Sequence, residues 1–102
     1  MPIVICRNAK TLVATVASGA DVVFDLTTLN AGGAEEVIIS ASDADVYIEK
    51  DAATTIAVPS STPAACSFLV KDGGSLTLGS RASKIYAQAA SGSATVYVMA
   101  IF

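Results

Sequence analysis

Short runs of β-branched residues alternate with turn-forming residues along the whole chain, and this spacing constrains the fold more than any other feature. Turn signals come about every 8–12 residues, which is typical of an all-β sandwich or barrel. The expected strands are residues 3–6, 11–16, 22–26, 35–42, 45–49, 54–58, 66–71, 75–78, 84–89 and 94–102. We therefore expect one domain over residues 1–102, an antiparallel β-sandwich or jelly-roll-like barrel of about eight short strands with little or no helix.

Two glycine-containing turns lie between expected strands. They are Asp72-Gly73-Gly74 and Ser91-Gly92-Ser93. Asp-Gly and Gly-Gly supply the positive φ angles that a tight β-hairpin needs, so we predict a hairpin at each turn. The second hairpin would join "KIYAQA" to "ATVYVMAIF".

The last expected strand is apolar on both faces. Alternation puts Ala94, Val96, Val98, Ala100 and Phe102 on one face and Thr95, Tyr97, Met99 and Ile101 on the other. A sheet with one solvated face would show polar residues on one of these sides. We therefore predict that a neighbouring subunit covers the second face. The candidate anchors of a subunit or capsid interface, some of which the core alone could claim, are Ile3, Ile5, Tyr97, Val98, Met99, Ile101 and Phe102.

The composition argues against nucleic acid and membranes as partners. Charged residues make up 15% of the chain, below the typical value of about 25%. A surface with so few charges tends to associate with other proteins. The six basic residues are scattered and are outnumbered by nine acidic ones, so we expect no nucleic-acid binding. Prolines or a central turn interrupt the two long uncharged stretches, and a spanning helix needs about 20 predominantly apolar residues.

The sequence offers little for catalysis. It contains no histidine, so neither a Ser-His-Asp nor a Cys-His arrangement can be built, and two cysteines alone cannot complete a usual zinc site. We expect no enzyme activity, no cofactor and no small-molecule substrate. Asp43, Asp45, Glu49 and Asp51 lack the spacing of a calcium loop, and we interpret them as a solvated strand face rather than as a calcium site or a glycosidase-like pair.

Cys6 and Cys66 are the only cysteines. No basic stretch precedes the short apolar run near residue 3, so we expect no secretion signal and synthesis in a reducing compartment. Both cysteines are interpreted as buried free thiols, because free cysteine is commonly buried. A disulfide bridge between them stays open as the alternative.

The succession of strands and turns resembles a known group of proteins. After a short apolar strand come "SGADVVFDLTTLNAGGAEEVIISASDADVYIEKD", a Pro/Ser/Thr loop, "FLVKDGGSLTLGS" and "KIYAQAASGSATVYVMAIF". This pattern resembles the small β-sandwich virion proteins of tailed bacteriophages, most of all the capsid decoration, or cement, proteins. The resemblance covers most of the chain as a pattern of strands and turns, and no single motif in it is diagnostic.

The resemblance implies a structural role on the virion, after synthesis in the host cytoplasm. Cement proteins sit as homotrimers over the three-fold positions of the head and clamp neighbouring copies of the major capsid protein, without catalytic residues or a cofactor. Another phage part, such as a tail, baseplate or fibre-attachment module, is an alternative. A carbohydrate-binding β-sandwich is a further one, disfavoured because the chain has no tryptophan and its Tyr and Phe residues are interpreted as packing residues.

Overall fold

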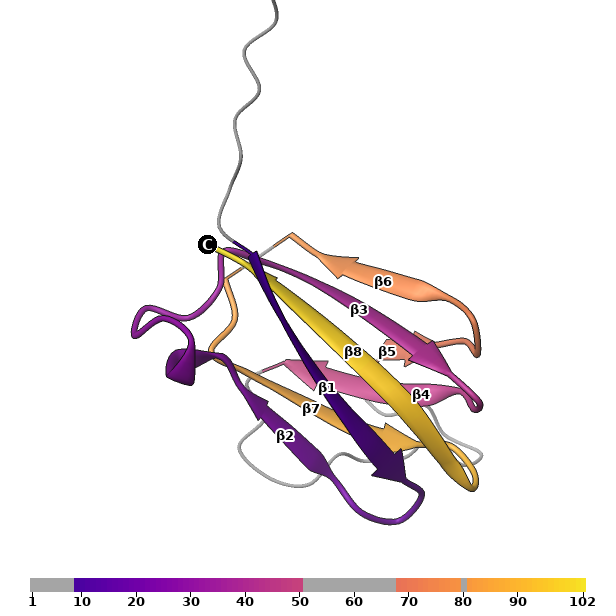
Figure 1. Ribbon diagram of the computed structural model, residues 1–102. Coiled ribbons are helices and arrows are strands. Elements are labelled where there is room, and N and C mark those ends of the chain that lie inside the picture. Colours follow the sequence, from indigo (N-terminus) through magenta and orange to yellow (C-terminus); the bar gives the residue numbers. More distant parts are fainter. Residues whose placement is uncertain (1–8, 51–67, 80) are drawn as a thin grey trace, which may run out of the picture.

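The computed structural model describes residues 9–50, 68–79 and 81–102. The expected strands over residues 3–6 and 54–58, together with Ile3, Ile5, Cys6, Asp51 and Cys66, lie outside these ranges. The described residues form one short 3-10 helix, η1 (Leu26–Thr28), and eight strands (Figure 1). The strands are β1 (Ala9–Ala17), β2 (Val22–Asp25), β3 (Glu36–Ser42), β4 (Val46–Lys50), β5 (Phe68–Val70), β6 (Ser75–Leu78), β7 (Lys84–Ala89) and β8 (Ser93–Ile101).

The eight strands form two antiparallel sheets of four strands each. Sheet A has the order β1-β8-β3-β6, and sheet B has the order β2-β7-β4-β5. The first strand pairs with the eighth, the second with the seventh, the third with the sixth and the fourth with the fifth. One long hairpin folded over on itself gives this nesting, which is the arrangement of a double-sheet jelly roll. The prediction of an antiparallel β-sandwich is confirmed, and the sheets do not close into a barrel.

The prediction of a hairpin at each of the two turns is wrong, although both turns exist. The turn at Gly73 joins β5 of sheet B to β6 of sheet A, and the turn at Gly92 joins β7 of sheet B to β8 of sheet A. Both glycines have the expected positive φ, +78° and +57°. The chain reverses across the sandwich instead of within a sheet, because the apolar faces of both sheets are buried in one shared core.

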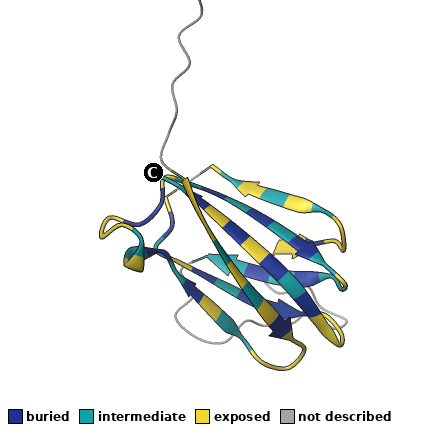
Figure 2. Cartoon of the chain, in the orientation of Figure 1, coloured by how far each residue is buried: buried dark blue, intermediate teal, exposed yellow. Residues whose placement is uncertain are grey.

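The core lies between the two sheets and is built from Val, Ile and Ala. Along β8, Ala94, Val96, Val98 and Ala100 are buried, and burial alternates with exposure along the strand (Figure 2). Opposite them, β7 contributes Ile85, Ala87 and Ala89. The predicted two faces of the last strand are therefore confirmed, with the alanine and valine side facing the core.

Two adjacent residues of β8 allow the contribution of a core residue to stability to be compared with that of a surface residue. Val98 is fully buried, whereas its neighbour Met99 is exposed on the opposite face. We expect Val98→Ala to lower the free energy of unfolding by about 2 kcal/mol, because it leaves a cavity between the sheets. Met99→Ala should change it by less than about 0.5 kcal/mol in the isolated subunit. Urea denaturation of the two variants measures both effects, and equal losses would contradict the observed register.

Candidate interaction surface

The outward side of sheet A is nearly free of charge. The strand registers assign to it fifteen residues of types Thr, Ser, Val, Ala, Ile, Met and Tyr, together with the single carboxylate of Glu36 at one end. We call this surface the uncharged face. Its members are Ala9, Thr11, Val13, Thr15 and Ala17 of β1, Ser93, Thr95, Tyr97, Met99 and Ile101 of β8, Glu36, Ile38, Ser40 and Ser42 of β3, and Ser75 and Thr77 of β6.

Large apolar side chains gather at the centre of the uncharged face. Met99 lies between Thr11 and Ile38 across the strands. Tyr97 lies between Val13 and Ser40 in the next row. Val13, Tyr97 and Met99 are 59%, 46% and 38% exposed. Contiguous exposed apolar groups of this kind are typical of protein interaction sites.

The outward side of sheet B has a different character. The same alternation places Asp25, Glu49 and Lys84 on it, with tyrosine and glutamine side chains between them. Gln88 donates from its side-chain nitrogen to Oδ1 of Asp21 at 2.8 Å. Charged residues at this spacing are the ordinary outer face of an antiparallel sheet. The uncharged face is therefore a property of one sheet rather than of the composition as a whole.

The predicted interface residues divide into three groups. Tyr97, Met99 and Ile101 lie together on the uncharged face. Val98 points into the core and is fully buried within one subunit. It therefore cannot contact a partner directly and acts only through the packing of β8. Phe102 packs partly against the core.

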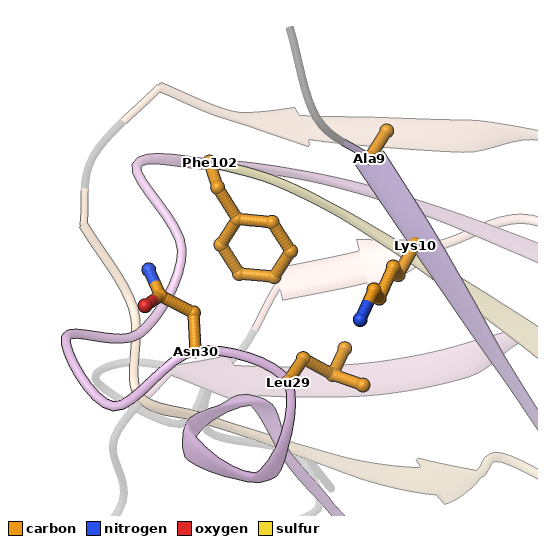
Figure 3. Close-up of a pocket in the computed structure, with 5 residues that line it drawn as sticks. All are labelled: Ala9, Lys10, Leu29, Asn30 and Phe102. Carbon is orange, nitrogen blue, oxygen red and sulfur yellow. The ribbon is translucent and has the colours of Figure 1, made fainter.

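Phe102 also lines a surface hollow of about 450 Å³ between the start of β1 and the connection from β2 to β3. The other lining residues are Ala9, Lys10, Leu29 and Asn30, and the side chains of Lys10, Leu29 and Phe102 converge on it (Figure 3). No local sequence pattern predicts this grouping, because Leu29 and Phe102 are brought together only by the packing of one connection against the end of β8.

The connection that bears Leu29 and Asn30 is held in a fixed shape. The backbone N–H of Gly33 donates to the carbonyl of Asn30 at 2.8 Å, and the side-chain amide of Asn30 donates to the carbonyl of Gly33 at 3.1 Å. Gly33 has φ +75°, and a Cβ on it would lie 2.5 Å from the carbonyl oxygen of Ala82. Only glycine fits this position without a shift of the neighbouring backbone.

The acidic residues near the start of β4 fasten two turns together. The carboxylate of Asp45 accepts the backbone N–H of Asp72 at 2.9 Å and the ammonium of Lys71 at 3.2 Å. The carboxylate of Asp72 accepts the backbone N–H of Asp43 at 2.9 Å. The turn after β3 is thereby tied to the turn after β5. Asp43 has φ +81°, so Asp43 and Asp45 belong to this corner, not to the continuous strand face that was expected; Glu49 does lie on β4.

Hydrogen bonds lower the pKa of two carboxyl groups. The backbone N–H of Asp72, and then the ammonium of Lys71, hold the pKa of Asp45 below its ordinary value of 3.8. The hydroxyl and backbone N–H of Thr27, with a smaller contribution from the charge of Lys84, lower the pKa of Asp25, which caps the start of η1. Both groups act in structure, because their oxygens are already engaged by donors of the same chain.

The described ranges hold no group of three or more Cys, Asp or Glu side chains placed to bind a metal ion. Within the same ranges, no helix is long and apolar enough to cross a membrane. Comparison of the sequence with protein-family models and with curated proteins finds no match.

The corner at Asp45 should give the protein an acid-sensitive component of stability. Because its folded-state pKa is lowered, the ionised carboxylate stabilises the fold above about pH 4, and this contribution disappears as the pH falls through the folded-state value. We expect Asp45→Asn to lower stability at pH 7 and to make the decline in Tm below pH 4 shallower. Calorimetry from pH 7 to pH 2 measures both, and an unchanged slope would show that the corner does not contribute.

Proposed function

We propose that this chain is a structural virion protein of a tailed bacteriophage, which decorates the outside of the head and bridges subunits of the major capsid protein. The observation that carries the proposal is the uncharged face of sheet A. The resemblance in the order of strands and turns supports the choice of partner. Copies of the chain itself are a second partner.

The uncharged face has the composition of an interface core. Such cores are depleted of charge and enriched in Tyr and Met, and a few large side chains near the centre supply most of the binding energy. Tyr97 and Met99 occupy that central position, with the hydroxyls of Thr11 and Ser40 beside them. A hydrogen-bonded sheet presents these groups without a loss of backbone entropy on binding.

The fold alone would not select this function. Double-sheet jelly rolls occur in viral capsid proteins and also in lectins and cupins. A decoration protein needs to make several weak contacts with neighbouring capsid subunits at once, because multivalent attachment turns modest individual affinities into stable binding. The single charge of the uncharged face, Glu36, lies at one end, so a contact at its centre does not require a charge to lose its water.

Substitution of Tyr97 tests the proposal. We expect Tyr97→Asp to weaken attachment to undecorated heads of the parent phage by about 2 kcal/mol, roughly thirtyfold in Kd, because it places a charge at the centre of the contact. The matched control is Val23→Asp, since Val23 is 48% exposed on the outward side of sheet B. Pelleting of protein with heads gives the affinities, and electron microscopy gives the position.

Two results would overturn the proposal. If the unaltered protein leaves intact heads bare under conditions that preserve them, the head is not its partner. If Val23→Asp reduces binding as much as Tyr97→Asp, the uncharged face is not the contact surface.

A carbohydrate-binding role is the second candidate, and the hollow is the observation that favours it. Phe102 offers an aromatic ring, and Asn30 and Lys10 offer polar groups beside it. We rank it second because the hollow has a single aromatic residue. If it binds sugars, a glycan array probed with the protein should give hits that Phe102→Ala abolishes and Tyr97→Ala retains; an array without hits would retire this candidate.

A further inference from the structure

The outer edge of β1 stands apart from the other three sheet edges. Within the part of the chain that the structure describes, the edge strands of the two sheets are β1, β6, β2 and β5, with nine, four, four and three residues respectively. Among the described residues β1 pairs on one side only, with β8. A long unpaired edge is a template for another strand, and short edges are one of the ways in which proteins avoid such pairing.

β1 also lacks the other features that protect an edge. Its register with β8 runs through nine consecutive pairs without a bulge. Its sequence, "AKTLVATVA", contains no proline and a single charge, Lys10, near one end. The middle of the strand consists of Thr, Val, Leu and Ala, which suit a further strand beside them.

The backbone groups available at this edge can be assigned from the ladder. The N–H of Ser18, one residue beyond β1, donates to the carbonyl of Gly92 at 2.9 Å. Because hydrogen-bonded residues alternate along an antiparallel pair, Leu12, Ala14 and Val16 direct their backbone groups to β8. Thr11, Val13 and Thr15 direct theirs to the open edge.

We propose that β1 pairs antiparallel with β1 of a second copy, about a two-fold axis at Val13. This register overlaps the full length of both strands, since Val13 is the midpoint of Ala9–Ala17. It sets Val13 opposite Val13 of the second copy and Thr11 opposite Thr15. The outward-directed N–H and C=O groups of one strand then meet those of the other, which is the requirement for a hydrogen-bonded pair.

Charge selects the antiparallel arrangement. In a parallel pair the two Lys10 side chains would lie side by side, about 5 Å apart, and like charges directly opposite are destabilising. In the antiparallel pair each Lys10 lies opposite Val16 of the other copy, and the two ammonium groups are separated by about 20 Å along the strands. No other charge occurs within β1.

The pairing makes one continuous sheet of the two copies of sheet A and doubles the uncharged face. It is a closed two-fold contact, so it differs from the trimer that the resemblance implies. The inference does not depend on attachment to a phage head, and it is tested on the purified chain alone.

Introducing a positive or a negative charge at Val13, on the proposed two-fold axis, tests both the contact and its register. The unaltered protein should have a mass twice the 10.3 kDa of one chain in light scattering. Val13→Lys and Val13→Glu should each weaken self-association roughly tenfold, because each places like charges opposite one another at the axis. An equimolar mixture of the two variants should restore the dimer. Val23→Lys, on the short edge β2, is the matched control and should remain dimeric.

Amide hydrogen exchange on the same samples reports the edge directly. The amides of Thr11, Val13 and Thr15 should be protected in the unaltered dimer and should exchange at least tenfold faster in Val13→Lys, whereas those of Leu12 and Ala14 should stay protected in both. A monomer or a trimer in light scattering would overturn the proposal. Failure of the mixed variants to associate would overturn the register at Val13.

Discussion

The burial of β7 against β8 is the constraint on which the rest of this structure depends. Each is an inner strand of its sheet, and β8 pairs with β1 on one side and β3 on the other. The inward residues of β8, such as Val96 and Val98, are fully buried. A shift of one residue would turn Tyr97 and Met99 into the core and expose the valines, so the alternation along β8 fixes the register of all of sheet A.

The corners hold the two sheets in this relation. Successive strands cross from one sheet to the other at Gly73 and Gly92, and the carboxylate of Asp45 ties the turn that contains Asp72 to the start of β4. Before β3, Gly33 lies close to the backbone of Ala82, and its neighbour Ala34 forms a β-bridge with Ala82. Polar and glycine residues at these corners thus position the strands.

Because the core takes one side of each sheet, the other side of each sheet faces outward, and the two outward sides differ in character. Sheet B carries Asp25, Glu49 and Lys84 outward, whereas sheet A presents Tyr97 and Met99 among hydroxyl groups. The proposed head contact uses the surface of sheet A, and the proposed self-pairing uses its β1 edge. The two contacts are compatible, because one involves side chains above the sheet and the other involves backbone groups in its plane.

The class of fold, most strand boundaries within the described residues and the two-sidedness of β8 could be predicted from the sequence alone. Those features follow from β-branched runs, turn residues and alternation, which act over a few neighbouring residues. The partners of each strand were decided only in the tertiary structure: a turn at Gly92 fits a hairpin or a crossing equally well, and the choice depends on which apolar faces meet in the core. The same holds for the uncharged face, which needs β1, β3, β6 and β8 side by side, and for the hollow, where Lys10, Leu29 and Phe102 converge from separate parts of the chain. Strand pairing over long sequence distances is set by the sum of many contacts, and no local pattern records it.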